Sequence, residues 1–155
     1  MKDLGVAKQI FGIEIHRDRI KGKHNVSHEK YVEKIIVRFR MNKENPVNVP
    51  LASPFNISSG LCPSSVEEKD YMSHVRYANT IGCLIYAMVC TRPDISHAVG
   101  VISKYMENIG KEHWNAVKWV FWYIRAKSDH CITFNNNNDF VFGFVDLDFV
   151  GDLDM

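Results

Sequence analysis

Alternating apolar and polar positions near the start of the chain predict a β-hairpin. Residues 9–15 are rich in isoleucine and phenylalanine, which favour strands, although Gly12 weakens the middle of this stretch. The Lys-Gly-Lys sequence at 21–23 is a turn signal, and a return strand opens at Asn25. We therefore expect a small hairpin within residues 1–26.

Helical periodicity follows this hairpin. Apolar residues three and four positions apart predict an amphipathic helix over residues 28–40, with Ser27 as its N-cap. Ser65 and Glu68 fit a capping box that begins a continuous or broken helix leading into an apolar run. Because residues 77–88 are apolar nearly all round, we expect them to form the central buried helix.

Two further helices are predicted towards the C-terminus. Pro93 suits the first position of one of them, and Gly110 suits its end. The other covers residues 111–126, with Trp119 and Trp122 off its main apolar stripe. These two tryptophans are candidates for base stacking, but we favour an interpretation in which another element covers them.

The remaining segments complete the predicted fold. Proline and serine recur through residues 43–66, which predicts a long irregular connection. Two apolar segments, 131–134 and 140–145, flank an asparagine-rich turn and predict a second hairpin. The fold class expected is therefore α+β, with an N-terminal β-hairpin, about four helices and a C-terminal β-hairpin.

The composition is that of an ordinary globular protein. Of the 155 residues, 46% are hydrophobic and 24% are charged, and the net charge of +1 neither demands nor excludes nucleic acid. The longest apolar run, 81–89, is too short to span a bilayer, and the start lacks a secretory signal. The four cysteines form no closely spaced pair that would suit zinc. We expect an intracellular protein, in cytoplasm or nucleus, without a membrane partner.

Charge is segregated, with a basic front and an acidic tail after residue 127. The predicted nucleic-acid-binding residues are basic side chains of the hairpin turn and of the helix that follows: Lys21, Lys23, Lys30, Lys34 and Arg38. Lysine and arginine would contact the phosphate backbone without reading base sequence, and this binding would weaken with salt. The alternative is a solvated helix face.

Three other residues are expected to be structural. Arg92 and Asp94 flank a proline at a helix start, where a carboxylate suits the helix dipole. The histidines show no metal-ligand spacing, and His113 is expected to serve in the core or as a cap.

A series of short motifs resembles one family of proteins. In chain order the motifs are residues 10–15 (Ile-Phe-Gly-Ile-Glu-Ile), 27–31 (Ser-His-Glu-Lys-Tyr), 91–95 (Thr-Arg-Pro-Asp-Ile), 112–114 (Glu-His-Trp) and 144–148 (Phe-Val-Asp-Leu-Asp). Together they resemble the Pol polyprotein of copia-type LTR retrotransposons, and the resemblance covers nearly the whole chain.

The resemblance implies a position within reverse transcriptase. Residues 1–26 would be the end of the palm with a primer-grip-like hairpin, and 27–127 the thumb and connection-like helical region, including the irregular loop 43–66. Residues 128–155 would be the truncated start of ribonuclease H. The parent activity is RNA-directed DNA synthesis. Its partners would be an RNA–DNA hybrid or template–primer, together with the missing palm and ribonuclease H segments.

The resemblance also implies that this chain lacks most of the catalytic carboxylates. Asp146 matches the first metal-binding aspartate of the ribonuclease H, which uses Mg²⁺ in the parent enzyme. The polymerase carboxylates would lie upstream of position 1, and a single carboxylate cannot assemble a two-metal site. We expect no cofactor and no catalysis, and at most hybrid binding. The alternatives are a non-catalytic helical protein-interaction remnant and a decayed copy without function.

Overall fold

The computed structural model describes residues 8–41, 47–52, 55, 57–63 and 65–135. In these residues the elements are, in chain order, β1 (Gln9–Ile10), β2 (Ile13–Asp18), β3 (Lys23–Ser27), α1 (Glu29–Arg38), the 3₁₀ turn η1 (Ser59–Leu61), α2 (Val66–Ser73), α3 (Tyr77–Cys90), the 3₁₀ turn η2 (Pro93–Ile95), α4 (Ser96–Ser103), α5 (Lys111–Ala126) and β4 (Cys131–Asn135). The α+β class is confirmed.

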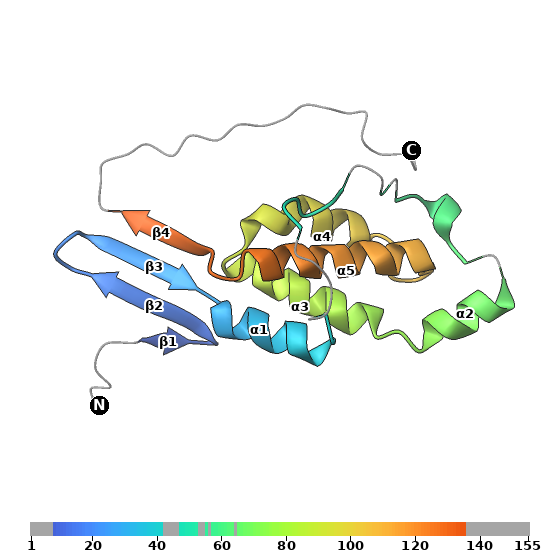
Figure 1. The fold of residues 1–155 in the computed structure, drawn as a ribbon, viewed down its shortest axis with the longest axis horizontal. Coiled ribbons are helices and arrows are strands. Elements are labelled where there is room, and N and C mark those ends of the chain that lie inside the picture. The colour runs from blue at the N-terminus through green and yellow to red at the C-terminus, as the bar shows by residue number, and fades with distance from the viewer. Residues whose placement is uncertain (1–7, 42–46, 53–54, 56, 64, 136–155) are drawn as a thin grey trace.

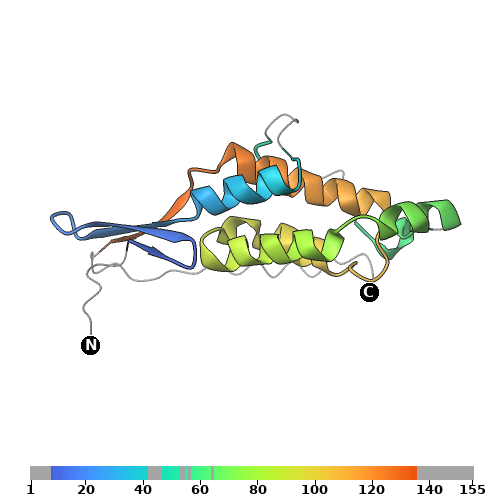
Figure 2. The ribbon, with the colours of Figure 1, turned by 90° about the horizontal axis from the view of Figure 1, so that it is seen from below.

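The helices pack in two layers. Figure 2 shows α1 and α5 in one layer and α3 and α4 in the other. The sheet projects from one end of these layers, and α2 lies at the other end (Figure 1). Large apolar side chains from both layers are almost fully buried and form the core: Ile35, Ile81, Leu84, Ile102, Val117, Phe121 and Ile124. Burial of these side chains is the main stabilising contribution, at roughly 1.5–3 kcal/mol for each.

The predicted N-terminal hairpin is present as β2 and β3, but the expected strand 9–15 is broken. Phe11 and Gly12 both have positive φ, 50° and 83°, and they turn the chain back so that β1 pairs antiparallel with β2. Positive φ at both central residues is the geometry of a tight two-residue hairpin turn. The strand prediction failed here because Gly12 permits a turn and does not merely weaken a strand.

β4 completes a four-stranded sheet in the order β1-β2-β3-β4. It pairs antiparallel with β3, from Ser27 opposite Cys131 to Lys23 opposite Asn135. The segment 140–145, expected to form a hairpin with it, lies outside the described residues. The three-part division of the chain stays a prediction, yet β4 places residues from its first and third parts in one sheet.

Helix starts differ in detail from those expected. α1 has His28 and not Ser27 as its N-cap, because Ser27 is the last residue of β3. Ser65 accepts a hydrogen bond from the Glu68 backbone N–H at 3.1 Å, as predicted. The Glu68 carboxylate does not close the capping box and instead accepts from the Lys111 N–H at 3.3 Å. This bond joins α2 to the start of α5.

Gly110 begins a helix and does not end one. α4 ends at Ser103, and Gly110 is the N-cap of α5. Its backbone N–H donates to Nδ1 of His113 at 2.9 Å, and a Cβ at position 110 would collide with the Leu61 carbonyl oxygen. Position 110 therefore requires glycine for close approach to the irregular segment before α2.

The prediction that residues 77–88 form the central buried helix holds for one face only. The face of α3 that packs on the core buries Tyr77, Thr80, Ile81, Leu84 and Ala87. The opposite face is exposed along the helix, at Asn79, Gly82, Tyr86 and Val89.

Candidate nucleic-acid interface

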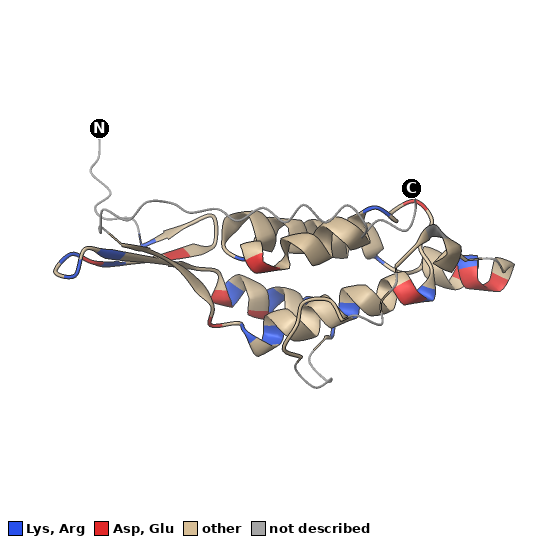
Figure 3. Ribbon diagram, turned by 90° about the horizontal axis from the view of Figure 1, so that it is seen from above, with Lys and Arg blue, Asp and Glu red and all other residues tan. Residues whose placement is uncertain are grey.

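All five predicted nucleic-acid-binding residues lie on one continuous arm made of β2, β3 and α1. Lys21 lies in the β2–β3 turn and Lys23 begins β3. Lys30, Lys34 and Arg38 follow on α1 at intervals of four, so they share one side of the helix. All five side chains are exposed. Figure 3 shows the blue segments of this arm at the hairpin tip and along α1.

The hairpin tip is held by a local carboxylate. Oδ1 of Asp18 accepts hydrogen bonds from the backbone N–H groups of Ile20 and Lys21, each at 3.1 Å. Gly22 has φ 62°, a conformation that glycine adopts without steric cost. The tip therefore presents Arg19 and Lys21 from a defined turn. The carboxylate of Asp18, in the same turn, is hydrogen-bonded to backbone N–H groups.

The tip carries more positive charge than α1. Residues 17–23 include four cations (Arg17, Arg19, Lys21 and Lys23) and one carboxylate, Asp18, whereas α1 sets its three cations against Glu29 and Glu33. Arg17 and Arg19 were not among the predicted site residues. The sequence shows that residues 17–23 have a net positive charge. The β2–β3 hairpin shows that these cations lie together at one tip.

A row of three side chains crosses the sheet beside this tip. Arg17 on β2 lies opposite His24 on β3, and His24 lies opposite Phe134 on β4. Directly opposite residues of antiparallel strands point to the same face. Arg17 and His24 are exposed, as is Phe134 at 56%. An arginine, a histidine and an aromatic ring are thus neighbours on one open surface, which sequence reasoning missed because β4 is distant in sequence.

Lys30 is partly neutralised within the chain. Its Nζ lies 2.5 Å from Oε1 of Glu14, and its side chain is 74% exposed. The hydrogen bond that Lys30 donates to Glu14 and the charge of that carboxylate raise the pKa of Lys30. Within the described residues Lys34 and Arg38 have no ion pair, and the Arg38 guanidinium lies 5.5 Å from the centre of the Phe39 ring. Lys34 and Arg38 are therefore the better donors on α1 for an external phosphate.

His28 anchors the sheet to the helices beneath the arm. It is 2% exposed, and its Nδ1 lies 3.3 Å from Oγ1 of Thr91. Its ring centre lies 5.3 Å from that of Tyr31 and 5.4 Å from that of Tyr86. The Tyr86 hydroxyl in turn donates to the Phe11 carbonyl at 2.6 Å. Burial outweighs a hydrogen bond with the Phe11 backbone and lowers the pKa of His28, which favours the neutral ring in this cluster.

Arg92 is structural and not part of the arm. The side chain is 2% exposed and donates two hydrogen bonds to the carboxylate of Asp94, at 3.0 and 2.8 Å. A third hydrogen bond reaches the Lys127 carbonyl at 2.9 Å, and the Tyr123 hydroxyl donates to Asp94 at 2.9 Å. Partial burial opposes ionisation of Asp94, but hydrogen bonds and charge from Arg92 outweigh it, so the pKa of Asp94 is lowered. This network ties the α3–α4 connection to the C-terminus of α5.

His113 and the two tryptophans are also built into the fold. Nδ1 of His113 accepts from Gly110, and its ring stacks on Tyr105 with centres 4.5 Å apart. The indole N–H of Trp119 donates to the Val49 carbonyl at 3.0 Å, so the irregular segment covers this ring as expected. Trp122 is half-buried beside it, with ring centres 5.9 Å apart.

Asp146, the predicted vestigial metal ligand, lies outside the described residues. Among those that are described, no three His, Cys, Asp or Glu side chains gather as they would to hold a metal ion. No helix in the described part of the chain has the length and apolar character needed to cross a membrane.

Comparison with known proteins identifies the relatives of this chain. It is 49% identical over 154 residues to the retrovirus-related Pol polyprotein from transposon TNT 1-94 of Nicotiana tabacum, a match that spans 99% of the chain. The chain is a homologue of the retrovirus-related Pol polyproteins of plant transposons. The resemblance found in the motifs is thereby confirmed, and the copia type is consistent with it. No family model and no solved structure matches the chain.

Further relatives agree with this assignment. The Pol polyprotein from transposon RE2 of Arabidopsis thaliana is 30% identical over 97% of the chain. An uncharacterized mitochondrial protein of the same plant is also 30% identical over 97% of the chain, which spans 59% of that protein. The chain spans only 12% of the tobacco polyprotein and 11% of the RE2 polyprotein.

Proposed function

We propose that this chain binds the sugar–phosphate backbone of an RNA–DNA hybrid or template–primer duplex through the arm of β2, β3 and α1. In this proposal the chain corresponds to the thumb and connection region of a reverse transcriptase, followed by the start of its ribonuclease H. Homology to transposon Pol polyproteins and the order of the motifs support that position.

The observation that carries the proposal is the grouping of exposed cations at the hairpin tip. Lysine and arginine neutralise phosphates and release condensed counterions, which supplies affinity without sequence preference. Phe134 lies in the same row as Arg17 and His24, and an exposed aromatic ring beside cations suits stacking on a base or sugar. The arm together with the adjoining strand β4 therefore offers both kinds of contact that sequence-tolerant nucleic-acid binding uses.

The proposal is tested by fluorescence anisotropy with a labelled RNA–DNA hybrid at several salt concentrations. Each phosphate contact contributes about 0.7–0.9 to the slope of log affinity against log salt. The double variant Arg19→Ala/Lys21→Ala should bind more weakly and should lower that slope by about 1.5. Lys34→Ala/Arg38→Ala should also weaken binding and lower the salt slope, but by less. The reason is that Glu29 and Glu33 already offset the positive charge of α1.

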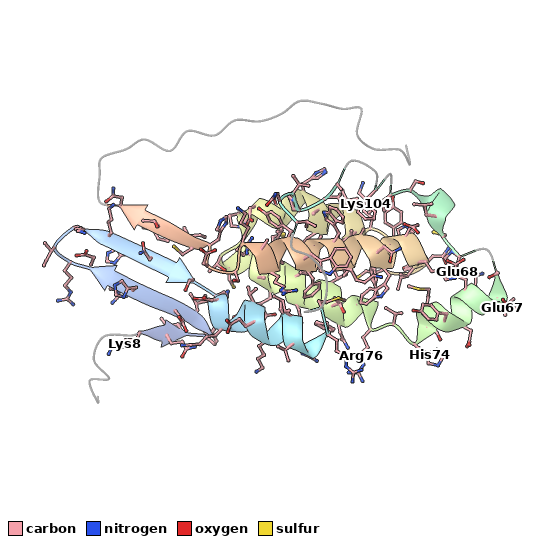
Figure 4. The ribbon with its side chains drawn as sticks, viewed as in Figure 1. Lys8, Glu67, Glu68, His74, Arg76 and Lys104 are labelled. Atoms are coloured by element: carbon pink, nitrogen blue, oxygen red, sulfur yellow. The ribbon has the colours of Figure 1, made fainter. Side chains whose placement is uncertain are left out.

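A matched control removes the same charge elsewhere. Lys69 on α2 and Arg76 before α3 are exposed, and Figure 4 shows Arg76 beside His74, away from the hairpin tip along the long axis of the molecule. Lys69→Ala/Arg76→Ala should leave the salt slope unchanged. Equal slopes for the tip variant and this control would rule the arm out as the binding surface.

A further inference from the structure

The exposed face of α3 carries two large exposed side chains, Tyr86 and Val89, and no charged residue. Asn79, Gly82, Tyr86 and Val89 recur at intervals of three and four, so they form one stripe along the helix. Val89 is 73% exposed and Tyr86 is 36% exposed. α3 and α4 contain no lysine, arginine, aspartate or glutamate. In Figure 3 the helices of the layer formed by α3 and α4 are drawn in tan, whereas α1 and α5 carry both charge colours.

This surface conflicts with the composition of the helix beneath it. A helix that is apolar nearly all round is normally covered on all sides, and a solvent-facing helix normally carries charge on its outer face. α1 follows that rule: its one large exposed apolar residue, Val37, stands among Glu33, Lys34 and Arg38. α3 has the composition of a fully covered helix, yet one face of it is open.

The open surface continues onto the β1–β2 turn. The hydrogen bond from the Tyr86 hydroxyl to the Phe11 carbonyl, at 2.6 Å, fixes the turn beside α3. Phe11 is 87% exposed and has φ 50°, a backbone conformation that is uncommon for residues other than glycine. We call the surface formed by these exposed residues the uncharged face: Phe11, Asn79, Gly82, Tyr86 and Val89.

Gly82 is not required by the packing of this chain. A Cβ at this position would meet nothing within 4 Å. Glycine inside a helix is unfavourable compared with alanine, and its usual compensation is close approach of another backbone. Nothing in the described chain makes such an approach at Gly82.

We propose that the uncharged face is the docking surface for another part of the same Pol polyprotein. The chain spans 12% of its tobacco relative, so most of that polyprotein lies outside it. A face without charge has little to offer phosphates or an acidic peptide, whereas apolar and small residues suit burial against a complementary apolar surface. The inference rests on the homology and on this face, and it is independent of nucleic-acid binding by the basic arm.

The test places this chain in the tobacco polyprotein in place of the homologous segment. Single cysteines are introduced by Phe11→Cys and Asn79→Cys at the two ends of the face, and by Val37→Cys on α1 as the matched control. Labelling by a water-soluble maleimide is followed by mass spectrometry. Positions 11 and 79 should label at least tenfold more slowly in the chimera than in the separate chain, and position 37 should label equally in both.

A second measurement is needed because a poorly folded chimera would label equally at all three positions. It compares the unfolding temperatures of two glutamate variants. Val89→Glu should lower the unfolding temperature of the chimera but not of the separate chain, and Val37→Glu should lower neither. Unchanged labelling ratios together with equal effects of the two glutamates would overturn the proposal. Slow labelling at 11 and 79 in the separate chain, relieved by dilution, would assign the face to a second copy and would also overturn it.

Discussion

Single residues show how a family motif is used here for packing. The Thr-Arg-Pro-Asp-Ile motif places Arg92 in the interior, where its guanidinium binds the Asp94 carboxylate and the Lys127 carbonyl. The Tyr123 ring lies 5.6 Å from the same guanidinium. Arginine is suited to this position because its planar fork donates to several acceptors at once. The structural role expected for Arg92 and Asp94 is what the structure shows.

Asp94 makes the stability of this network dependent on pH. Its pKa is lowered in the folded chain, so its contribution is fully present above its unfolded pKa, 3.8, and is lost as pH falls through the lower folded pKa. Asp94→Asn should reduce the free energy of unfolding by about 1–2 kcal/mol at pH 7, because a charged hydrogen bond is lost at a partly exposed site.

Urea unfolding at pH 7, 5, 4 and 3 measures this effect. The difference between the natural chain and Asp94→Asn should be constant from pH 7 to 5 and should shrink as the pH falls from 4 to 3. Asp70→Asn, at an exposed position on α2, is the control and should give a small difference without that trend. A difference for Asp94→Asn that is constant over this range would refute the ion-pair account.

At the scale of elements, local patterns predicted most helices and failed where contacts are distant in sequence. The stripe in residues 28–40 and the box at Ser65 gave α1 and the start of α2 because both signals are local. The pairing of β4 with β3 could not be predicted, since more than a hundred residues separate the strands. The burial of α3 was mispredicted because an apolar composition shows only that a helix is suited to burial. It does not show whether other elements of this chain pack against every side of the helix.

The start of α5 provides a second test at this scale. A Cβ at Gly110 would collide with the backbone carbonyl of Leu61, which cannot move aside as a flexible side chain would. Gly110→Ala should therefore lower the free energy of unfolding by about 2 kcal/mol, typical of overpacking. In Gly100→Ala, the control, the new Cβ meets nothing within 4 Å, and replacing a helical glycine should raise stability by up to about 1 kcal/mol.

Chemical denaturation of the two alanine variants separates these outcomes by sign. Destabilisation at position 110 with stabilisation at position 100 supports the packing of the irregular segment against α5. If both variants were more stable than the natural chain, Leu61 would not lie against Gly110 in solution.

The whole molecule carries two different kinds of exposed surface. The arm of β2, β3 and α1 carries exposed cations (Figure 3), and the outer side of α3 carries no charge. The five predicted site residues were found from sequence because basic residues are concentrated in one stretch. Arg17, His24 and Phe134 became neighbours only through the sheet register. Nucleic-acid contact by all of these residues stays a prediction.

The central claim, that the arm is a nucleic-acid interface, is tested most directly by NMR titration of the isotope-labelled chain with an RNA–DNA hybrid. Backbone resonances of residues 16–24, 33–38 and 132–135 should shift and saturate together, and those of α2 (Val66–Ser73) should stay in place. The shifts should diminish as salt is raised, because phosphate contacts are screened. Shifts confined to α2 or the uncharged face, or none at all at low salt, would contradict the account.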